Sequence, residues 1–399
     1  MKDSPGKIRL ALAMEYPLHQ QGGVEVLVRE LVRGLAEQFE IVLVSGDPNR
    51  EALGEEFASL VTTHFSWNKA EPSRQSARDL ANALADQGIK LAHFHSGGTY
   101  DWQSHKAWQS PILYLTGIGV PCLVTSHSTP LAFDGFTRPD RPAWQKALLL
   151  LKAWISKAFL LSGERLELSV SKQSRDKLSR LFPPFAGKFG FMYHSKLKRE
   201  NHGLPPNQRK KIVFCLGTIC ELKGQMVLIH AFASTAKQHP EWNLHLMGRH
   251  EPPGYLDELK EVATRLGISD RVQISPPQND PSPVLACSSI FVLPSLREGL
   301  GLSLQEALYY ECACIGSDVG GIPELIENET TGLLVPPGDE NALAAALDRL
   351  MSEPELRLRL TRQARQSIVE KGMLVDIMVE NHIRLYEAIL AGEEASWIH

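Results

Sequence analysis

The sequence is poor in the features that mark a disulfide-stabilised or metal-binding domain. Its six cysteines are scattered, and no two of them form a Cys-x-x-Cys pair. Most lie in or beside strand-like apolar runs, where reduced and buried thiols are common. Cys312 and Cys314 stand closer together than zinc ligands usually do. The cysteine usage therefore fits a reducing compartment, and the sequence predicts no metal site.

Long hydrophobic runs and an excess of one charge are also missing. The longest apolar stretch, residues 147–161, is interrupted by Lys152 and Lys157 and is shorter than the roughly 20 residues of a spanning helix. The run 8–14 is too short for a signal peptide. With 42 basic and 46 acidic residues the net charge is −4, which argues against nucleic acid as a partner. We expect a cytoplasmic protein, with peripheral contact at the inner face of a membrane left open.

The chain also lacks the dinucleotide-binding pattern Gly-x-Gly-x-x-Gly after a strand. Gly117-Ile118-Gly119 has neither the third glycine nor a following helix. Its absence counts against a nicotinamide-dependent dehydrogenase.

Strand-like and helix-like segments alternate through both halves of the sequence. In residues 24–39, for example, apolar side chains recur at helical spacing with charged residues opposite, which predicts a helix. Such alternation predicts an α/β protein with a doubly wound parallel sheet in each half. A polar stretch with paired prolines, residues 201–209, predicts a linker. We assign residues 1–205 to a first domain, 206–372 to a second, and 373–399 to a C-terminal helix.

The most informative stretch lies between residues 298 and 324. Glu298 opens a glycine-rich turn that follows a strand-like run, and Glu306 stands eight residues further on, in the helix that the turn begins. Gly320-Gly321-Ile322-Pro323-Glu324 follows about one strand later. Backbone amides at a helix start can face phosphates, and carboxylates can accept hydrogen bonds from hydroxyls. The arrangement therefore suits the recognition of a sugar nucleotide.

Together with the flanking residues 291–295 and 332–339, this pattern resembles glycosyltransferase family 4, whose members are retaining enzymes of the GT-B fold. The resemblance is specific over residues 211–347. It implies two Rossmann-like, doubly wound parallel-sheet domains that face a cleft, with C-terminal helices that cross back to the first domain. It also implies that Glu298 contacts the donor hexose and Glu306 the nucleotide ribose. The backbone that would face the sugar and the phosphates belongs to Gly299, Leu300, Gly301 and Leu302.

Lys223 and Gly224 stand in the predicted loop between strand 211–217 and helix 225–237. A lysine in such a loop can reach a diphosphate while the helix amides face it. The resemblance implies that Lys223 neutralises the donor diphosphate, and that Gly217 and Thr218 line the same loop. The family often has arginine where Thr218 stands. The phosphate charge is then either less fully matched or met by another cation, such as Arg249 or Arg297.

Three candidate site residues fall in the first half. Gly22 and Gly23 lie between the first strand and the first helix, where their small size lets a backbone approach a ligand closely. His127 follows strand 122–126, at the edge of the sheet where doubly wound folds bind ligands. The resemblance implies that both places face the donor, with His127 beside the transferred sugar. For His93 and His95 we favour acceptor-side or packing roles, since two ligands are too few for a metal.

From these residues we expect a metal-independent hexosyltransferase without a cofactor. Its donor would be a UDP-, GDP- or ADP-sugar and its acceptor a saccharide, a lipid or a small molecule, as in the synthesis of cell-envelope polysaccharide. We expect Lys223, Glu298 and His127 to be catalytic. Departures from the family pattern at Thr218, Leu222 and residues 193–195 keep open a non-catalytic GT-B partner or a sugar-nucleotide-binding subunit. A GT-B nucleotide-sugar epimerase is the other alternative.

The predicted helix 142–160 has two interpretations. Its lysines and its large apolar residues, Trp154 among them, could seat on an anionic bilayer. We favour a helix that packs into the core, with lysines extended towards water.

Overall fold

A computed structural model describes residues 7–19, 22–68, 72–97, 106–128, 142–200, 203–205, 208–250, 254–278 and 280–398. It divides into two compact units, residues 1–194 with 375–399, and residues 195–374. The first boundary falls before the predicted linker 201–209, part of which lies outside the described residues.

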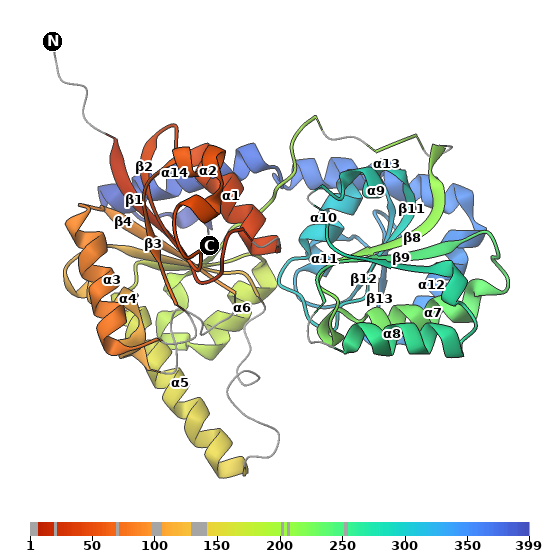
Figure 1. Cartoon of the computed structure of the whole chain (residues 1–399), viewed down its shortest axis with the longest axis horizontal. Helices are drawn as coiled ribbons and strands as arrows, with labels where there is room; N and C mark the ends of the chain where they lie inside the picture. Colours follow the sequence, from red (N-terminus) through yellow and green to blue (C-terminus); the bar gives the residue numbers. More distant parts are fainter. Residues whose placement is uncertain are drawn as a thin grey trace. The chain divides into compact units, whose positions relative to one another are not determined.

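In the described part of unit 1, seven parallel strands form one sheet in the order β3-β2-β1-β4-β5-β6-β7 (Figure 1). The strands are β1 Ile8–Met14, β2 Phe39–Ser45, β3 Val61–Ser66, β4 Leu91–Ser96, β5 Cys122–Ser126, β6 Leu166–Ser169 and β7 Phe189–Phe191. The longer helices are α1 Gly23–Leu35, α3 Arg74–Asp86, α5 Ala143–Gly163, α6 Lys172–Leu181 and α14 Val375–Ala391, and the shorter ones α2 Glu55–Ser59 and α4 Pro111–Gly117. The inner strands are buried along nearly their whole length, as expected of a parallel sheet covered on both faces.

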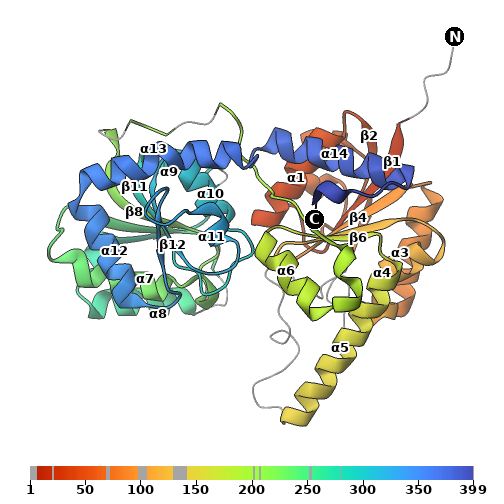
Figure 2. The ribbon, with the colours of Figure 1, turned by 180° about the vertical axis from the view of Figure 1, so that it is seen from behind.

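The last helix, α14, belongs to unit 1 although it is the final long element of the chain (Figure 2). It packs against α1, where Gly34 leaves room for Val379. The Tyr386 ring meets the edge of Phe39 at the start of β2. Its apolar face is thus part of the core of unit 1.

In the described part of unit 2, six parallel strands follow the order β10-β9-β8-β11-β12-β13. The strands are β8 Lys210–Leu216, β9 Asn243–Met247, β10 Val272–Ser275, β11 Ser288–Leu293, β12 Ala313–Ser317 and β13 Leu333–Val335. The helices are α7 Gln225–Ala236, α8 Tyr255–Arg265, α9 Ser282–Cys287, α10 Leu302–Tyr309, α11 Ile322–Leu325, α12 Glu340–Ser352 and α13 Pro354–Glu370. Both sheets confirm the predicted fold class.

Three local predictions were wrong. Phe39 is the first residue of β2 and not the end of the first helix, because α1 stops at Leu35 and Phe39 is buried as strand. Strand β3 was missed, since it lies at the edge of the sheet and its polar side chains give little apolar signal. Strand β7, only three residues long, was also missed, although it pairs with β6.

Candidate functional site

The sheet order of unit 2 reverses between two neighbouring strands, β8 and β11. From β8 the chain moves outward to β9 and β10, and from β11 it moves the other way to β12 and β13. Open α/β sheets bind ligands beyond the carboxyl ends of the strands at such a reversal. Lys223 lies in the connection that follows β8 and Glu298 in the one that follows β11. The topology therefore brings these two predicted residues to one place.

The two connections are packed backbone against backbone, and only a glycine allows it. Gly224 has φ of 67°, and a Cβ on it would lie 2.1 Å from the carbonyl oxygen of Pro294. The amide of Leu296 donates to the carbonyl of Leu222 at 2.9 Å. Gly224 is also the cap residue before α7, so the sequence pair Lys223-Gly224 fixes both the turn and the position of the lysine.

Lys223 and Glu298 form a direct ion pair. The distance from Lys223 Nζ to Glu298 Oε2 is 2.5 Å, and 27% of the lysine side chain is exposed. Glu298 also accepts hydrogen bonds from Ser295 Oγ and from the Gly299 amide. Burial opposes the charge on Lys223, but Glu298 outweighs it and raises the pKa of the lysine. The site therefore presents a fixed ammonium that solvent reaches in part.

Beside this ion pair lies the start of helix α10. Gly301, with φ of 96°, is its cap residue, and a Cβ there would lie 3.6 Å from Glu298 Cγ. The carbonyl of Gly299 accepts from the Gly321 amide at 2.9 Å, which ties the turn to the connection after β12. Leu300 is buried and anchors the turn. The turn thus places Glu298 at a helix N-terminus, where unpaired amides attract anions.

Glu306 lies further along α10, and its side chain is almost fully buried. Its partner is Lys196, whose Nζ lies 2.8 Å from Glu306 Oε1. Burial raises the pKa of Glu306, and the charge of Lys196 opposes this shift. Sequence reasoning missed Lys196, because it stands about a hundred residues before Glu306 and belongs to no motif.

Gly217 and Thr218 lie where the connections after β8 and β9 touch. A Cβ on Gly248 would lie 1.8 Å from the carbonyl oxygen of Gly217. The amide of Ile219 donates to the carbonyl of Arg249 at 2.7 Å. Gln225 Nε2 donates to the carbonyl of Thr218. Arg249, one of the two cations that could replace the missing arginine, thus comes next to the predicted loop through its backbone.

Gly22, Gly23 and His127 belong to unit 1. The two glycines begin α1 and follow β1, which with β4 forms the corresponding reversal in this sheet. His127 follows β5, and its Nε2 lies 3.0 Å from Nδ1 of His95 on β4. Burial lowers the pKa of His127 well below its usual value, so this imidazole is neutral near neutral pH. His93 is buried and bonds to Tyr386 and Thr125, which supports the packing role.

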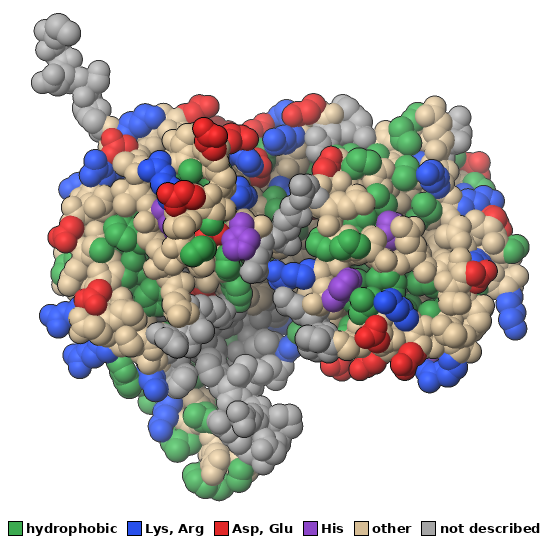
Figure 3. All heavy atoms as spheres, viewed as in Figure 1, with side chains coloured by type: hydrophobic (Ala, Val, Ile, Leu, Met, Phe, Trp, Pro, Cys, Tyr) green, Lys and Arg blue, Asp and Glu red, His purple; other side chains and the backbone are tan. Residues whose placement is uncertain are grey.

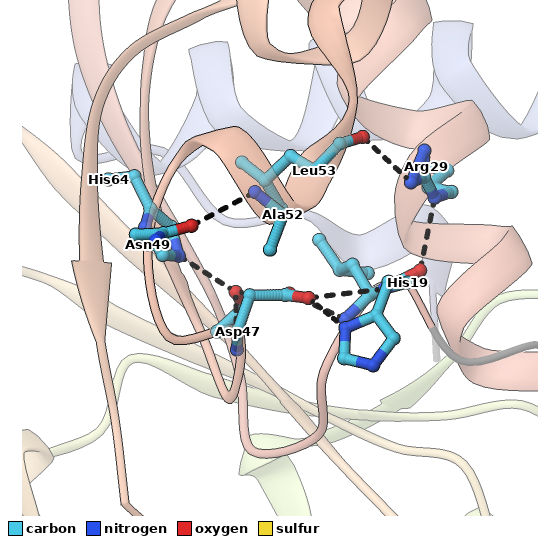
Figure 4. Close-up of polar contacts among 9 residues, drawn as sticks. His19, Arg29, Asp47, Asn49, Ala52, Leu53 and His64 are labelled. Carbon is cyan, nitrogen blue, oxygen red and sulfur yellow. Dashed lines mark hydrogen bonds and ion pairs between the residues drawn. The ribbon is translucent and has the colours of Figure 1, made fainter.

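A polar network that the sequence analysis missed lies at the same edge of unit 1 (Figure 4). The buried carboxylate of Asp47, just after β2, accepts hydrogen bonds from the Leu18 amide at 2.6 Å and from Ser45 Oγ at 2.7 Å. Its other oxygen lies 2.6 Å from Nδ1 of His19. Burial would raise the pKa of Asp47, but these hydrogen bonds outweigh it and lower the pKa. Asp47 therefore stays ionised and holds the chain just before Gly22. The sequence did contain a signal for this network, namely an acidic residue, Asp47, just after a strand.

Within the described residues, no group of three or more His, Cys, Asp and Glu side chains could hold a metal ion. None of the helices described there combines the length and apolar character needed to cross a bilayer.

Two doubly wound parallel sheets, one with a lysine–glutamate pair at its reversal point beside a helix N-terminus, define a two-domain α/β protein suited to a phosphorylated ligand. The family model of glycosyl transferases group 1 matches residues 198–367, and that of Glycosyltransferase Family 4 matches residues 21–185. One model thus falls on each unit. The chain belongs to these group 1, family 4 glycosyltransferases.

Individual relatives agree with this assignment. Alpha-maltose-1-phosphate synthase of Mycobacterium tuberculosis is 26% identical over 95% of this chain and 99% of its own length. An uncharacterized glycosyltransferase of Haemophilus influenzae is 30% identical over 44% of this chain, and the match spans only 51% of that protein. The structure of HepE from Anabaena in complex with UDP and glucose shares the fold, with a TM-score of 0.74 at 14% identity over 95% of this chain and 99% of that one.

Proposed function

We propose that the protein transfers a hexose from a nucleoside diphosphate sugar to a saccharide, lipid or small-molecule acceptor, with retention of anomeric configuration. The observation that carries the proposal is the Lys223–Glu298 pair at the β8–β11 reversal beside the start of α10. The binding of UDP and glucose by a protein of the same fold supports this class of donor.

The hard step in this chemistry is the departure of the diphosphate, on which negative charge develops. Lys223 and the N-terminal amides of α10 supply oriented positive charge, and preorganised groups of this kind need no rearrangement during the reaction. Before the donor binds, Glu298 holds the ammonium in place. When a diphosphate shares that ammonium, a Glu298 oxygen becomes available to accept a hydrogen bond from a sugar hydroxyl.

Retention follows if both bonds at the anomeric carbon change on the same face of the sugar. The bond to the phosphate oxygen breaks through a transition state like an oxocarbenium ion, and the acceptor oxygen bonds to that carbon. The acceptor proton passes to the departing phosphate oxygen, so the route demands no separate base. No step in the proposal uses a metal or a cofactor. Gly22, Gly23 and His127 keep the roles that the family resemblance implies for them, as predictions.

The test is a screen with UDP, GDP, ADP and their sugars, measured first as a shift in melting temperature and then as turnover. We expect one nucleotide family to stabilise the protein, and Lys223→Gln to lower kcat/KM about 100- to 1,000-fold. Lys260→Gln, at an exposed position on α8, is the matched control and should leave both values unchanged. The anomeric configuration of the product is determined by NMR.

Three outcomes would contradict the proposal. A product of inverted configuration rules out retention. Absence of turnover across the screen favours a non-catalytic partner protein or, if a nucleotide still stabilises the chain, a sugar-nucleotide-binding subunit. A change in the sugar of the donor without any transfer to an acceptor favours the epimerase.

A further inference from the structure

Helix α5 exposes an unusual amount of apolar surface. Its exposed large side chains include Trp144, at 67%, and Phe159, at 57%, and also Leu148, Leu151 and Ile155. The interpretation favoured from the sequence, a helix packed into the core, is therefore wrong for this face. The first turns of α5 extend beyond the sheet and the other helices of unit 1 in both views of the ribbon (Figures 1 and 2).

The exposed apolar side chains form one stripe. At 3.6 residues per turn, Trp144, Leu148, Leu151, Ile155 and Phe159 fall within an arc of about 80° along roughly 22 Å of helix. The buried residues of the second half, Ala153, Ser156 and Leu160, lie on the opposite side. We call these five exposed residues the α5 stripe. Figure 3 shows hydrophobic side chains at the projecting end of this helix.

The C-terminal half of α5 is firmly attached to unit 1, so the stripe has a fixed orientation. Lys157 and Glu167 form a fully buried ion pair at 2.5 Å. Trp154 stacks on Phe182, and its Nε1 donates to the carbonyl of Leu181. Lys188 Nζ donates to the last carbonyls of the helix, among them that of Leu161 at 2.6 Å. The core of unit 1 thus uses one face of α5 and leaves the stripe uncovered.

The segment of chain that contains the stripe has an excess of positive charge. Helix α5 contains three lysines and no acidic residue, and its Lys146 and Lys152 are not buried. From residue 143 to residue 188 the chain has nine Lys or Arg residues and three Asp or Glu residues, a local net charge of +6 in a chain of net charge −4. Of the three acids, Glu164 and Glu167 are buried. The segment that carries the stripe therefore attracts anions more strongly than the chain as a whole.

We propose that the α5 stripe docks unit 1 onto the surface of a bilayer that contains anionic lipids. An amphipathic helix with tryptophan and large aliphatic residues on one face and lysines on the rest of its surface lies in the headgroup region, apolar face down. The alternative occupant is a second copy of the chain. A twofold dimer through this face would bring two regions of charge +6 together, which disfavours it, whereas an anionic surface is complementary.

The test measures binding to sedimented vesicles of phosphatidylcholine, with and without roughly one third phosphatidylglycerol. We expect binding that requires the anionic lipid and weakens at high salt. Changing Leu151, Ile155 and Phe159 together to serine should lower the partition coefficient at least about tenfold. Changing Lys146 and Lys152 to glutamine should lower it about fivefold for each lysine, on anionic vesicles only.

The matched controls lie in unit 2: Leu266→Ser, at an exposed apolar position, and Lys260→Gln should bind vesicles like the unchanged protein. Because the substituted residues are exposed, the variants should keep their melting temperature and their stabilisation by nucleotide, which separates this result from failure of the transferase proposal. Blue-shifted tryptophan emission on anionic vesicles, reduced in Trp144→Phe, would place the helix in the apolar layer.

Equal vesicle binding by the serine variant and the unchanged protein would overturn the proposal. So would a dimer in sedimentation velocity that the serine changes dissociate, combined with no vesicle binding, since the stripe would then be an interface between copies of this chain.

Discussion

Lowering the pH from 7.5 to 5.0 is expected to destabilise unit 1 more than unit 2. Five imidazoles, four of them buried and the fifth, His127, partly exposed, gather in unit 1, with ring centroids of neighbours 4.1 to 5.6 Å apart. Burial lowers the pKa of each, and the neighbouring histidines lower it further in four of them. The residues are His93, His95, His127, His194 and His382. All five are therefore neutral in the folded protein at pH 7.

The direction and size of the effect follow from proton binding. A histidine has a pKa of about 6.5 in the unfolded chain, and that of His382 falls to about 4 in the folded one. Below pH 6.5 the unfolded chain binds more protons, so the stabilisation is complete above that pH and declines as the pH falls towards 4. At pH 5 the loss is about 2 kcal/mol for His382 alone. The pKa values of the other four histidines are lowered in the same direction, so these residues add to the loss.

Hydrogen exchange read peptide by peptide is the suitable assay, because it separates the two units. Protection in β4, β5 and α14 should fall between pH 6.5 and 5.0, after correction for the intrinsic exchange rate. His382→Leu should remove about 2 kcal/mol of that pH dependence. His230→Gln, a substitution on α7 in the other unit, should leave the protection of unit 1 unchanged. Protection that stays constant down to pH 5.0 would refute the reasoning.

Two further substitutions test the packing on which the sites depend. Gly224→Ala should destabilise unit 2 by about 3 kcal/mol or more and abolish stabilisation by nucleotide, because φ is positive and the added Cβ would collide with the backbone of Pro294; an unchanged melting temperature would contradict this. Lys157→Met should cost about 3–5 kcal/mol in chemical denaturation by leaving the Glu167 charge buried and unpaired. Adding Glu167→Leu should recover much of that loss, and a double variant as unstable as the single one would show that the charge is not the cause.

Much of the fold could be predicted because apolar strands and amphipathic helices repeat with a clear period. The C-terminal helix predicted within residues 373–399 corresponds to α14, and the pair Lys223-Gly224 follows β8 as expected. The failures fall where a local signal is weak. The edge strand β3 is polar, and the short strand β7 follows two prolines. Whether such a segment forms a strand depends on the neighbouring strands with which it can pair.

In the candidate site, too, some residues could be recognised from a local pattern and others could not. Glycines and a lysine at strand–helix connections were visible as motifs, since such turns restrict the residue types that they accept. The partners were not visible: Lys196 beside Glu306, Asp47 beside His19 and His95 beside His127 are each separated along the chain from the group that they contact. Contacts of this kind depend on how the strands are ordered.

The sequence by itself predicted the two sheets, because hydrophobic period is a local property, and the class of protein, through the resemblance of residues 211–347 to a known family. It also singled out Lys223, Glu298 and Glu306 as candidate site residues, whose roles stay predictions. Only the tertiary structure shows which charged side chains form ion pairs and which helix faces stay exposed to solvent. The composition of α5 suits a core helix and a surface helix equally well, and only the packing of unit 1 shows that one side of it is used and the stripe is left exposed. The physical reason is that burial depends on what lies opposite a residue in space, which no window of sequence contains.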